Sequence, residues 1–452
     1  MSITSVDLHV PPEHLTLPER IGQYRVLRRL GDGSTSEVFL CRDDFRDRDV
    51  AIKRVRASVL ADVDEGRFHE RFFAAEAALV GQIQHPNVVQ IYDAVADPHS
   101  PYVVMEYVEG GTLRPYCRAD QLQSLELIVE IGFKCAMALG YVSRLGLIHR
   151  DVKPANILTA TVKGSITGVK LTDFGSVLNL RSDATQVYRV GSIAYMSPEQ
   201  LDGSTLDSRA DMYSLGAVLY HLIAGRPPFD AQEQAVLVNQ IYHHAPTPPS
   251  ELRGSVSPAV DAVILRALAK PVDQRYADWD EFAQALSALI SNHEVPRGQL
   301  QGVLDSERFT LLRSLAFFSR FGDVALWEVV HRAHWERFAF GHAVYHKGEE
   351  GRTFHIIAQG QVEVHRDGHR VAQLGAGTSV GEMAYLAPSE DLRVHSADVV
   401  VSKPCTTISF TPESLAQLGA GCRHHFDEAF IGVLVRRLHA AHEALAHPRR
   451  IL

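Results

Sequence analysis

Near the middle of this chain of 452 residues lies the run His149-Arg150-Asp151-Val152-Lys153-Pro154-Ala155-Asn156. The run Asp173-Phe174-Gly175 follows, with Asp173 seventeen positions after Asn156. Together they supply two carboxylates, an amide and an ammonium group. Carboxylate and amide oxygens suit Mg²⁺, and transfer of a phosphoryl group depends mainly on positioned charges. These two runs therefore contain the candidate catalytic residues.

A glycine-rich run, Gly31-Asp32-Gly33-Ser34-Thr35-Ser36, precedes them between two strand-like segments. A hairpin at this place could lay its backbone N–H groups over a triphosphate. Lys53 ends the next strand, where it could neutralise phosphate oxygens, and Glu76 on a predicted helix over residues 66–82 could pair with it. Alone the glycine-rich run is a weak signal, because Ser36 stands where a third glycine is usual. Lys53 alone could equally be a solvated lysine.

The composition is that of a globular protein. Hydrophobic residues make up 46% of the chain and charged residues 22%, which is far from the composition of disordered proteins. At about 150 residues per domain, this length predicts about three structural units or two larger ones. The net charge is −9, from 45 basic and 54 acidic residues without long runs of one sign, which argues against binding to nucleic acid.

The five cysteines are scattered and form no C-x-x-C pair, which disfavours a disulfide framework or a zinc site. The 23 histidines have no acidic or cysteine partners at metal-ligand spacing, so we expect them to be solvated or core residues. The chain starts without a basic segment followed by an apolar one, and no apolar run is long enough to span a membrane. We therefore expect a soluble, cytoplasmic protein with no membrane span.

The pattern of elements changes along the chain. Residues 1–20 contain three prolines without periodicity and read as an extended or disordered lead-in. Strand-like runs at residues 24–30, 37–42 and 50–55 are followed, after residue 122, by mostly helical segments. The polar residues 291–303 predict a linker. Short glycine-punctuated strands and a final helix over residues 422–445 then predict a β-barrel or jelly roll.

The motifs, taken together and in this order, resemble the protein-kinase family, and specifically the bacterial Ser/Thr kinases of eukaryotic type. The resemblance covers about residues 24–290. Further matches are the hinge run Val104-Met105-Glu106-Tyr107-Val108, the run Ser197-Pro198-Glu199, Asp211, and Arg275 as the buried partner of Glu199. The resemblance implies an α+β bilobal kinase fold over residues 21–290.

The resemblance also assigns roles to individual residues. Asp151 would accept or orient the proton of the substrate hydroxyl, while Lys153 would steady the transferring group. Asn156 and Asp173 would hold Mg²⁺ or Mn²⁺, and Lys53, paired with Glu76, would bind ATP phosphates. The implied ATP-binding residues are Leu30, Gly31, Asp32, Gly33, Ser34, Thr35, Ser36, Val38, Ala51, Lys53, Met105, Glu106, Val108 and Leu158.

Substrate type and regulation follow from the same resemblance. Lys153, two residues after Asp151, and Gly191-Ser192 before Tyr195 match the Ser/Thr pattern, so the partners expected are proteins with Ser or Thr hydroxyls. Arg150 would benefit from a phosphate on the activation segment, for which Thr185 is the first candidate and Ser182 the second. The alternative is a pseudokinase, a folded scaffold without chemistry, but such proteins typically lack a metal or lysine position that this chain retains.

Residues 341–397 resemble the cyclic-nucleotide-binding family shared by catabolite-activator-like regulators and cyclic-nucleotide-dependent kinases. The run Gly381-Glu382-Met383-Ala384 and the later Arg393 carry the resemblance. Arg393 would supply a fork for the cyclic phosphate, the run at 381–384 would supply backbone amides, and Glu382 would accept a hydrogen bond from the ribose 2′-hydroxyl. Val394 lacks the hydroxyl associated with guanine preference, which slightly favours cyclic AMP over cyclic GMP.

Two features depart from that family. The stretch between Glu382 and Arg393 is longer by one or two residues, and it contains Glu390 and Asp391, whose charges would repel a phosphate that they faced. A degenerate barrel that docks or dimerises without ligand is therefore an alternative for residues 304–452, and the chain could form a homodimer.

We accordingly predict a bilobal protein-kinase fold followed by a β-barrel or jelly-roll cyclic-nucleotide-binding domain with flanking helices. Its function would be Ser/Thr phosphorylation, including autophosphorylation, with ATP and Mg²⁺. The ligand, cyclic AMP or cyclic GMP, would shift kinase activity by moving the C-terminal helix relative to the barrel. The rival from another class is a non-catalytic signalling adaptor in which both domains bind ligands.

Overall fold

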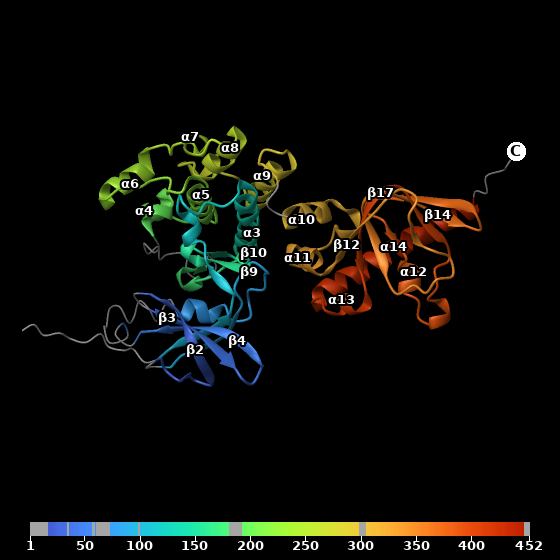
Figure 1. The fold of residues 1–452 in the computed structure, drawn as a ribbon, viewed down its shortest axis with the longest axis horizontal. Coiled ribbons are helices and arrows are strands. Elements are labelled where there is room, and N and C mark those ends of the chain that lie inside the picture. Colours follow the sequence, from blue (N-terminus) through green and yellow to red (C-terminus); the bar gives the residue numbers. More distant parts are fainter. Residues whose placement is uncertain are drawn as a thin grey trace, which may run out of the picture. The chain divides into compact units, whose positions relative to one another are not determined.

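The computed structural model of the chain describes residues 17–33, 36–56, 59, 73–97, 100–179, 192–297 and 304–446. The chain divides into two compact units, and Figure 1 labels their elements and colours them along the sequence. Unit 1 comprises Met1–Leu122, Cys135–Leu252 and Ile264–Trp279. Unit 2 comprises Gln123–Lys134, Arg253–Val263 and Asp280–Leu452. Helix α3 (Leu125–Arg144) thus contributes its first half to unit 2 and its second half to unit 1.

Unit 1 begins with an antiparallel sheet of six strands in the order β1-β2-β3-β4-β6-β5. Apolar side chains of β3 and β4, among them Phe39, Cys41, Val50 and Ile52, form the core on one side of this sheet. The strands expected at residues 24–30, 37–42 and 50–55 are therefore present and paired in sequence order. The strands are β1 (Arg20–Ile21), β2 (Tyr24–Asp32), β3 (Ser36–Asp43), β4 (Arg48–Val55), β5 (Ile91–Val95) and β6 (Tyr102–Glu106).

Strands β2 and β3, which flank the glycine-rich run, pair antiparallel. The backbone N–H of Gly33 donates to the carbonyl of Ser36 at 2.9 Å. Arg56 reaches the same turn, where its Nε donates to the Gly33 carbonyl at 2.9 Å and its guanidinium pairs with Asp32. These contacts fix the chain on both sides of residues 34 and 35, which lie outside the described residues.

The larger part of unit 1 is helical. Nearly every residue of α5 (Arg209–Ala224) is buried, so this helix, apolar on all sides, is central to the unit. Short strands pair in the orders β10-β9-β7 and β11-β8. The strands are β7 (Gly110–Thr112), β8 (Leu147–Ile148), β9 (Ile157–Val162), β10 (Ser165–Leu171) and β11 (Leu178–Asn179). The other helices are α4 (Pro198–Asp202), α6 (Gln234–His243), α7 (Pro249–Leu252), and α8 (Pro258–Ala267) and α9 (Trp279–Ser291), which both units share.

Four short 3₁₀ helices lie in the loops of this part of the chain. They are η1 (Arg114–Cys117), η2 (Pro154–Asn156), η3 (Phe174–Ser176) and η4 (Ile193–Tyr195), and a fifth, η5 (Val272–Gln274), precedes Arg275. The first central run ends in η2, which contains Asn156 but neither Asp151 nor Lys153, and the second begins at Asp173, just before η3. Both runs thus lie outside the α-helices and strands.

A buried ion pair ties α4 to the segment after α8. Arg275 donates through Nη1 and Nη2 to the two carboxylate oxygens of Glu199 at 2.7 and 2.9 Å. The Arg275 side chain is fully buried, and its other donors reach the carbonyls of Ala269 and Arg209, each at 2.8 Å. The partnership expected from the sequence is therefore present.

Replacing Arg275 with methionine should lower the free energy of unfolding by about 3–5 kcal/mol, because the variant leaves the Glu199 carboxylate without its buried partner. Urea unfolding of the full chain measures the change. The matched control is Arg118→Gln, which breaks an exposed pair with Asp120 (67% and 61% exposed) and should cost less than about 1 kcal/mol. Equal shifts in the two variants would contradict a structural role for the buried pair.

The C-terminal part of unit 2 is a β-barrel built on two long strands. Strands β14 (Phe354–Arg366) and β17 (Asp398–Phe410) lie at the centre of the order β12-β17-β14-β15, while β13 pairs with β17 and β16 pairs with β14. Gly360 lies at a bulge of β14 with φ +88°, where a Cβ would stand 2.2 Å from the Pro404 carbonyl oxygen. The other strands are β12 (His334–Phe338), β13 (Ala343–Tyr345), β15 (His369–Gly375) and β16 (Ser379–Val380).

Aromatic side chains join the final helix to the barrel and to the helices before it. Phe426 and Phe430 of α14 (Ala420–Ala446) contact Phe317 of η6 (Ala316–Phe318) and Phe354 of β14, with ring centroids 4.8 to 6.1 Å apart. The helix expected at residues 422–445 is present. Unit 2 also contains α12 (Glu382–Tyr385), η7 (Glu390–Leu392) and α13 (Pro412–Ala416).

Within unit 2, α10 (Asp305–Ser314) and α11 (Asp323–Arg332) pack on the first half of α3. Lys134 of α3 lies 2.8 Å from Asp305 and 3.5 Å from Glu130. Beside these charges, Phe133 of α3 contacts Phe309 of α10 and Trp327 of α11. The chain that follows residues 298–303 is therefore anchored by buried charged and aromatic contacts.

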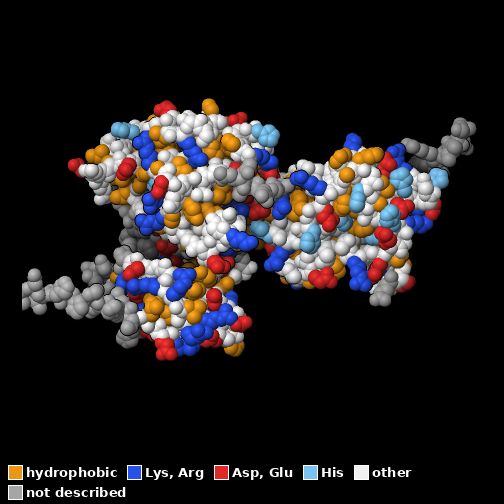
Figure 2. Space-filling view, viewed as in Figure 1, with side chains coloured by type: hydrophobic (Ala, Val, Ile, Leu, Met, Phe, Trp, Pro, Cys, Tyr) orange, Lys and Arg blue, Asp and Glu red, His pale blue; other side chains and the backbone are white. Residues whose placement is uncertain are grey.

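Figure 2 shows histidines scattered over the exposed face of the barrel region. Within residues that the structure describes, no group of three or more His, Cys, Asp or Glu side chains is placed to hold a metal ion. A search of the same residues finds no helix with the length and apolarity needed to cross a membrane.

Candidate active site and ligand cavity

Lys53 on β4 joins two carboxylates that lie far from it in the sequence. Its Nζ is 2.9 Å from Glu76, on the helical residues 73–78, and 2.6 Å from Asp173, just before η3. Burial opposes the charge of Lys53, but the charges of Asp173 and Glu76 outweigh it and raise the pKa of the lysine. The pairing of Lys53 with Glu76 expected from the sequence is present.

The pKa values of the two acids beside Lys53 shift in opposite directions. The positive charge of this lysine lowers the pKa of Asp173, which is therefore an anion at neutral pH. Burial raises the pKa of Glu76, while the nearby lysine and a hydrogen bond from the Gly175 backbone favour its charged form. Removal of Lys53 would thus leave two carboxylates close together without a cation between them.

Two other residues expected at the reaction centre donate hydrogen bonds to Asp151. Lys153 Nζ donates to Asp151 Oδ2 at 2.7 Å, and Asn156 Nδ2 donates to the same oxygen at 2.8 Å. A further bond from Asn156 Nδ2 to the backbone carbonyl of Asp151 (2.9 Å) closes the loop. Since the amide nitrogen of Asn156 is committed to Asp151, its Oδ1 is left as the acceptor.

Asp211, the first acidic residue of α5, holds this loop by its backbone. Its two carboxylate oxygens accept the N–H groups of His149 at 2.7 Å and Arg150 at 2.8 Å. Asp211 is buried, which raises its pKa, while the bonds from the loop favour its charged form. The loop before Asp151 is thus fixed from the core of unit 1.

Two residues of the site have left-handed backbone conformations. Arg150 has φ 65° and Asp173 has φ 66°, in a region that costs a non-glycine residue of order 1–3 kcal/mol. His149 lies between these positions, with its ring 4.7 Å from that of Phe174 and its Nε2 3.0 Å from the Thr172 carbonyl. The packing of the imidazole therefore joins the two strained turns.

Arg150 has a partner already in this structure. Its Nε donates to the carbonyl of Ser176 at 2.5 Å, and its own carbonyl accepts from Gln200 at 2.6 Å. The candidate phosphorylation sites Thr185 and Ser182 lie outside the described residues.

The residues expected to bind ATP come from several strands of unit 1. Val38 of β3 is paired with Lys53, and Ala51 of β4 is paired with Met105 of β6. Leu158 lies on β9, where it is paired with Thr112 of β7. Glu106 Oε2 accepts from Lys170 at 3.0 Å. Leu30, Gly31 and Asp32 lie on β2, whereas Val108 follows β6.

We expect Asp211→Asn to slow turnover and to lower the free energy of unfolding by about 1–3 kcal/mol, because an amide accepts only one of the two loop N–H groups. Steady-state kinetics and urea unfolding report the two effects. Asp202→Asn, which changes an exposed acid at the end of α4, should leave both quantities unchanged. An Asp211 variant with wild-type turnover would show that the loop does not need this support.

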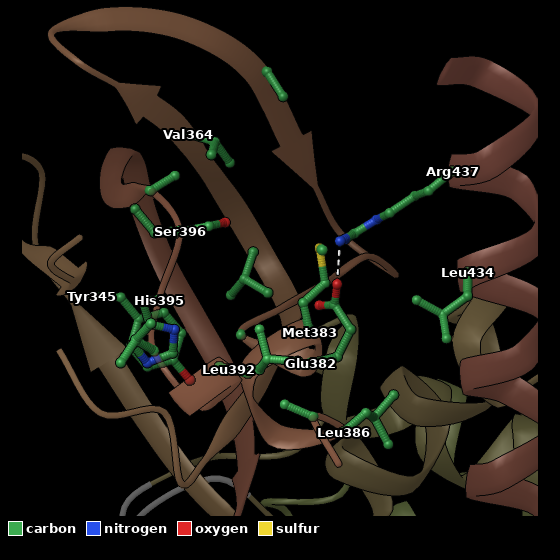
Figure 3. Close-up of a pocket in the computed structure, with 18 of the residues that line it drawn as sticks. Tyr345, Val364, Glu382, Met383, Leu386, Leu392, His395, Ser396, Leu434 and Arg437 are labelled. Atoms are coloured by element: carbon green, nitrogen blue, oxygen red, sulfur yellow. Dashed lines mark hydrogen bonds and ion pairs between the residues drawn. The ribbon is translucent and has the colours of Figure 1, made fainter. Parts of the chain in front are cut away.

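Unit 2 has a cavity of about 810 Å³ at its barrel, partly open to solvent (Figure 3). Most of the residues that line it are apolar. Of the residues expected at a ligand site, the lining includes Gly381, Glu382, Met383, Ala384 and Val394. Gly381 has φ +83°, and a Cβ at this position would stand 2.7 Å from the Tyr345 ring, so glycine is required at this turn.

Arg393 lies elsewhere. It is exposed, does not belong to the cavity lining, and donates through Nε to the carbonyl of Ala387 at 3.3 Å. The longer stretch between Glu382 and Arg393, noticed in the sequence, accommodates η7 over residues 390–392.

The lining also holds residues that sequence reasoning missed. Tyr345 and His395 stack with ring centroids 3.8 Å apart, and α14 contributes Leu434 and Arg437. Arg437 pairs with Glu382, whose side chain is 1% exposed, and this contact is the dashed line in Figure 3. Burial raises the pKa of Glu382, and Arg437 counteracts that shift. The sequence signal was a pair of arginines, Arg436 and Arg437, within an otherwise apolar stretch of the final helix.

Comparison with known proteins agrees with this geometry. Residues 24–288, more than half of the chain, match the family model of the protein kinase domain. The chain belongs to the protein kinase family. Residues 335–421 match the cyclic nucleotide-binding domain. The kinase domain thus contains Lys53, Asp151 and Asp173, and the second domain contains the cavity lining except for Leu434 and Arg437, which follow it.

The curated relatives include serine/threonine-protein kinases PknB of three mycobacteria. The protein of Mycolicibacterium smegmatis is 38% identical over 310 residues, which are 67% of this chain and 47% of that protein. Those of Mycobacterium leprae and Mycobacterium tuberculosis are 37% identical over 308 and 314 residues, or 66% and 68% of this chain, and 48% of each relative. The kinase chain therefore spans about half the length of the curated relatives it matches.

Proposed function

We propose that the protein is a Ser/Thr protein kinase that transfers the γ-phosphoryl group of ATP to protein hydroxyls, including its own. The observation that carries the proposal is the convergence of Lys53, Glu76 and Asp173 around one ammonium group, with Asp151, Lys153 and Asn156 around one carboxylate. The names of the curated relatives support Ser and Thr as the acceptor residues. A non-catalytic adaptor would have no need for both sets of charges in these arrangements.

The donor atoms fit a magnesium ion. Asp173 offers a carboxylate that is anionic at neutral pH, and Asn156 offers Oδ1, because its nitrogen is committed to Asp151. Mg²⁺ takes oxygen ligands of these two kinds, together with phosphate oxygens. When bound, the ion supplies charge that stabilises the transferring phosphoryl group.

The protein's own groups then have separate tasks. Lys53 binds phosphate oxygens of ATP and is kept in place by Glu76. Asp151 orients the hydroxyl of the substrate and takes its proton, and Lys153, 2.7 Å from Asp151, neutralises charge on the transferring group. We propose Thr185, and then Ser182, as the sites of autophosphorylation.

Asp151→Asn should lower kcat by about 10²–10⁴-fold, since an amide cannot take the proton of the hydroxyl. ATP binding should change little, because Lys53 and Asp173 are untouched. Transfer of labelled phosphate to a basic substrate protein measures kcat, and a fluorescent ATP analogue measures binding. Asp120→Asn, an exposed substitution, is the control. Retained transfer in Asp151→Asn, or no transfer by the wild-type protein under any condition, would contradict the proposal.

We propose further that the barrel binds a cyclic nucleotide, cyclic AMP or cyclic GMP, and that the ligand regulates the kinase. The match to the cyclic nucleotide-binding domain and the buried Glu382 in the cavity support this proposal. Glu382 would accept the ribose 2′-hydroxyl. The alternative is a ligand-free barrel that mediates docking or homodimer formation.

The cellular location that we propose is the cytoplasm. The kinase reaction requires ATP, and the five cysteines, all buried, are free thiols, as is usual in a reducing compartment.

Glu382→Gln should weaken binding of cyclic AMP or cyclic GMP by at least about tenfold, because a hydrogen bond to a charged acceptor is replaced by a weaker one. Isothermal titration of the full chain measures affinity, and kinase assays with and without nucleotide measure regulation. Glu413→Gln, an exposed change on α13, should bind as the wild type does. A wild-type protein that binds neither nucleotide would favour the ligand-free barrel.

A further inference from the structure

The charges around the barrel cavity are unevenly distributed. Among the described residues that line it, Arg437 is the one lysine or arginine, whereas Glu382 and Asp391 are both acidic. His395 also lies in the lining, but burial lowers its pKa, so it adds no second cation at neutral pH. An anion placed among mostly apolar walls is strongly disfavoured unless it is paired. A negatively charged ligand in this cavity therefore has one cation to contact.

That cation is held in a fixed place. Arg437 Nη1 pairs with Glu382 Oε1, and Nη2 donates to the carbonyl of Ser379 at 2.8 Å. Figure 3 shows the side chain extending from α14 toward Glu382, with Leu434 of the same helix pointing into the cavity. Arg437 is 39% exposed, so its guanidinium is accessible while both anchors hold it. A preorganised guanidinium of this kind suits a phosphate.

Arg393, which the sequence predicted to bind the phosphate, makes other contacts. Arg393 points out of the lining and bonds the Ala387 carbonyl, and its own carbonyl accepts the N–H of Gly351 at 2.8 Å. The next residue, Val394, forms a bridge with Glu350. Backbone contacts on both sides thus hold this segment with the Arg393 side chain outside.

We propose that Arg437, on the C-terminal helix, binds the anionic phosphate of the cavity's ligand in place of Arg393. This inference rests on the proposed function of the barrel as a cyclic-nucleotide site. Glu382 lies in the cavity lining beside Arg437, so the same ligand can contact both side chains. The ligand's charge is then held by α14 and its hydroxyl by α12, so that binding bridges the two elements.

The test compares a charged ligand with an uncharged one of the same shape. The probes are cyclic AMP and its methyl phosphotriester, or the cyclic GMP pair if cyclic GMP binds better, titrated into the full-length protein. The readout is the ratio of the two dissociation constants. Loss of Arg437 also removes the cation beside Glu382, and that carboxylate would then repel the charged probe but not the uncharged one. The Arg437 substitutions are therefore made and compared in a Glu382→Gln background, in which the ratio reports contact between Arg437 and the phosphate charge.

In Arg437→Gln the preference for the charged probe should fall by about tenfold or more, since a charge-assisted bond is lost. Arg437→Lys should restore part of it. Arg393→Gln should keep the wild-type ratio, as should Arg436→Gln, which changes an exposed arginine one position away on the same helix. Near-ultraviolet circular dichroism confirms that each variant is folded.

The outcomes distinguish a failure of this inference from a failure of the proposed function of the barrel. If the wild-type protein binds cyclic nucleotide but the ratio is unchanged in Arg437→Gln, or falls in Arg393→Gln instead, the assignment to Arg437 is wrong and the nucleotide site stands. Equal affinity of the wild-type protein for both probes would also overturn it. If the wild-type protein binds neither cyclic nucleotide, the proposed function of the barrel fails, and the inference fails with it.

Discussion

The pairing of one ammonium group with two carboxylates is the constraint on which the kinase site depends. Lys53, Glu76 and Asp173 come from three separate segments, and none of these groups can be buried alone without a large electrostatic cost. Buried ion pairs often add little net stability, because desolvation offsets the attraction. The triad therefore contributes less to stability than to determining how these segments fold together. The β-rich sheet, the helical residues 73–78 and the turn at η3 must meet in one arrangement for the charges to be satisfied.

A second layer of contacts keeps the reacting groups in place around that triad. Asp151 and Asp173 both follow or occupy turns with left-handed backbone, which are unfavourable unless the surroundings enforce them. Asp211 fixes the first turn through two backbone N–H groups, and the His149 ring packs between the two turns. Such rigidity suits phosphoryl transfer, in which the protein contributes mainly position and charge. Substitutions in this layer would misplace the charges without removing any of them.

The structure brings together the kinase residues that the sequence singled out, but it leaves Arg393 out of the cavity lining that contains the other barrel residues, and the reason is physical. The kinase motifs are short runs in which Asp151, Lys153 and Asn156 are close by covalent connection, so their spacing nearly determines their contacts. Lys53 and Asp173 required the fold, but opposite charges with few alternative partners meet wherever the fold permits. In the barrel, the path of the chain after Glu382 depends on a longer loop, and Arg393 leaves the cavity with it. Arg437 could not be placed from spacing, because its partner lies 55 positions away and is chosen by the packing of α14.

Both sites use a buried carboxylate held by a cation from a distant element, but they differ in how easily the partners can change. Lys53 lies between two acids with its side chain 23% exposed, so its displacement would leave the like-charged Glu76 and Asp173 without a cation between them. The side chain of Glu382 is also buried, yet its partner Arg437 is 39% exposed and has further N–H donors. An anion could therefore bind at Arg437 at a lower electrostatic cost than an anion that approached Lys53, whose charge is already shared by two acids. Arg437 belongs to α14 and Glu382 to α12, so an anion bound at Arg437 would contact the final helix directly rather than the barrel strands.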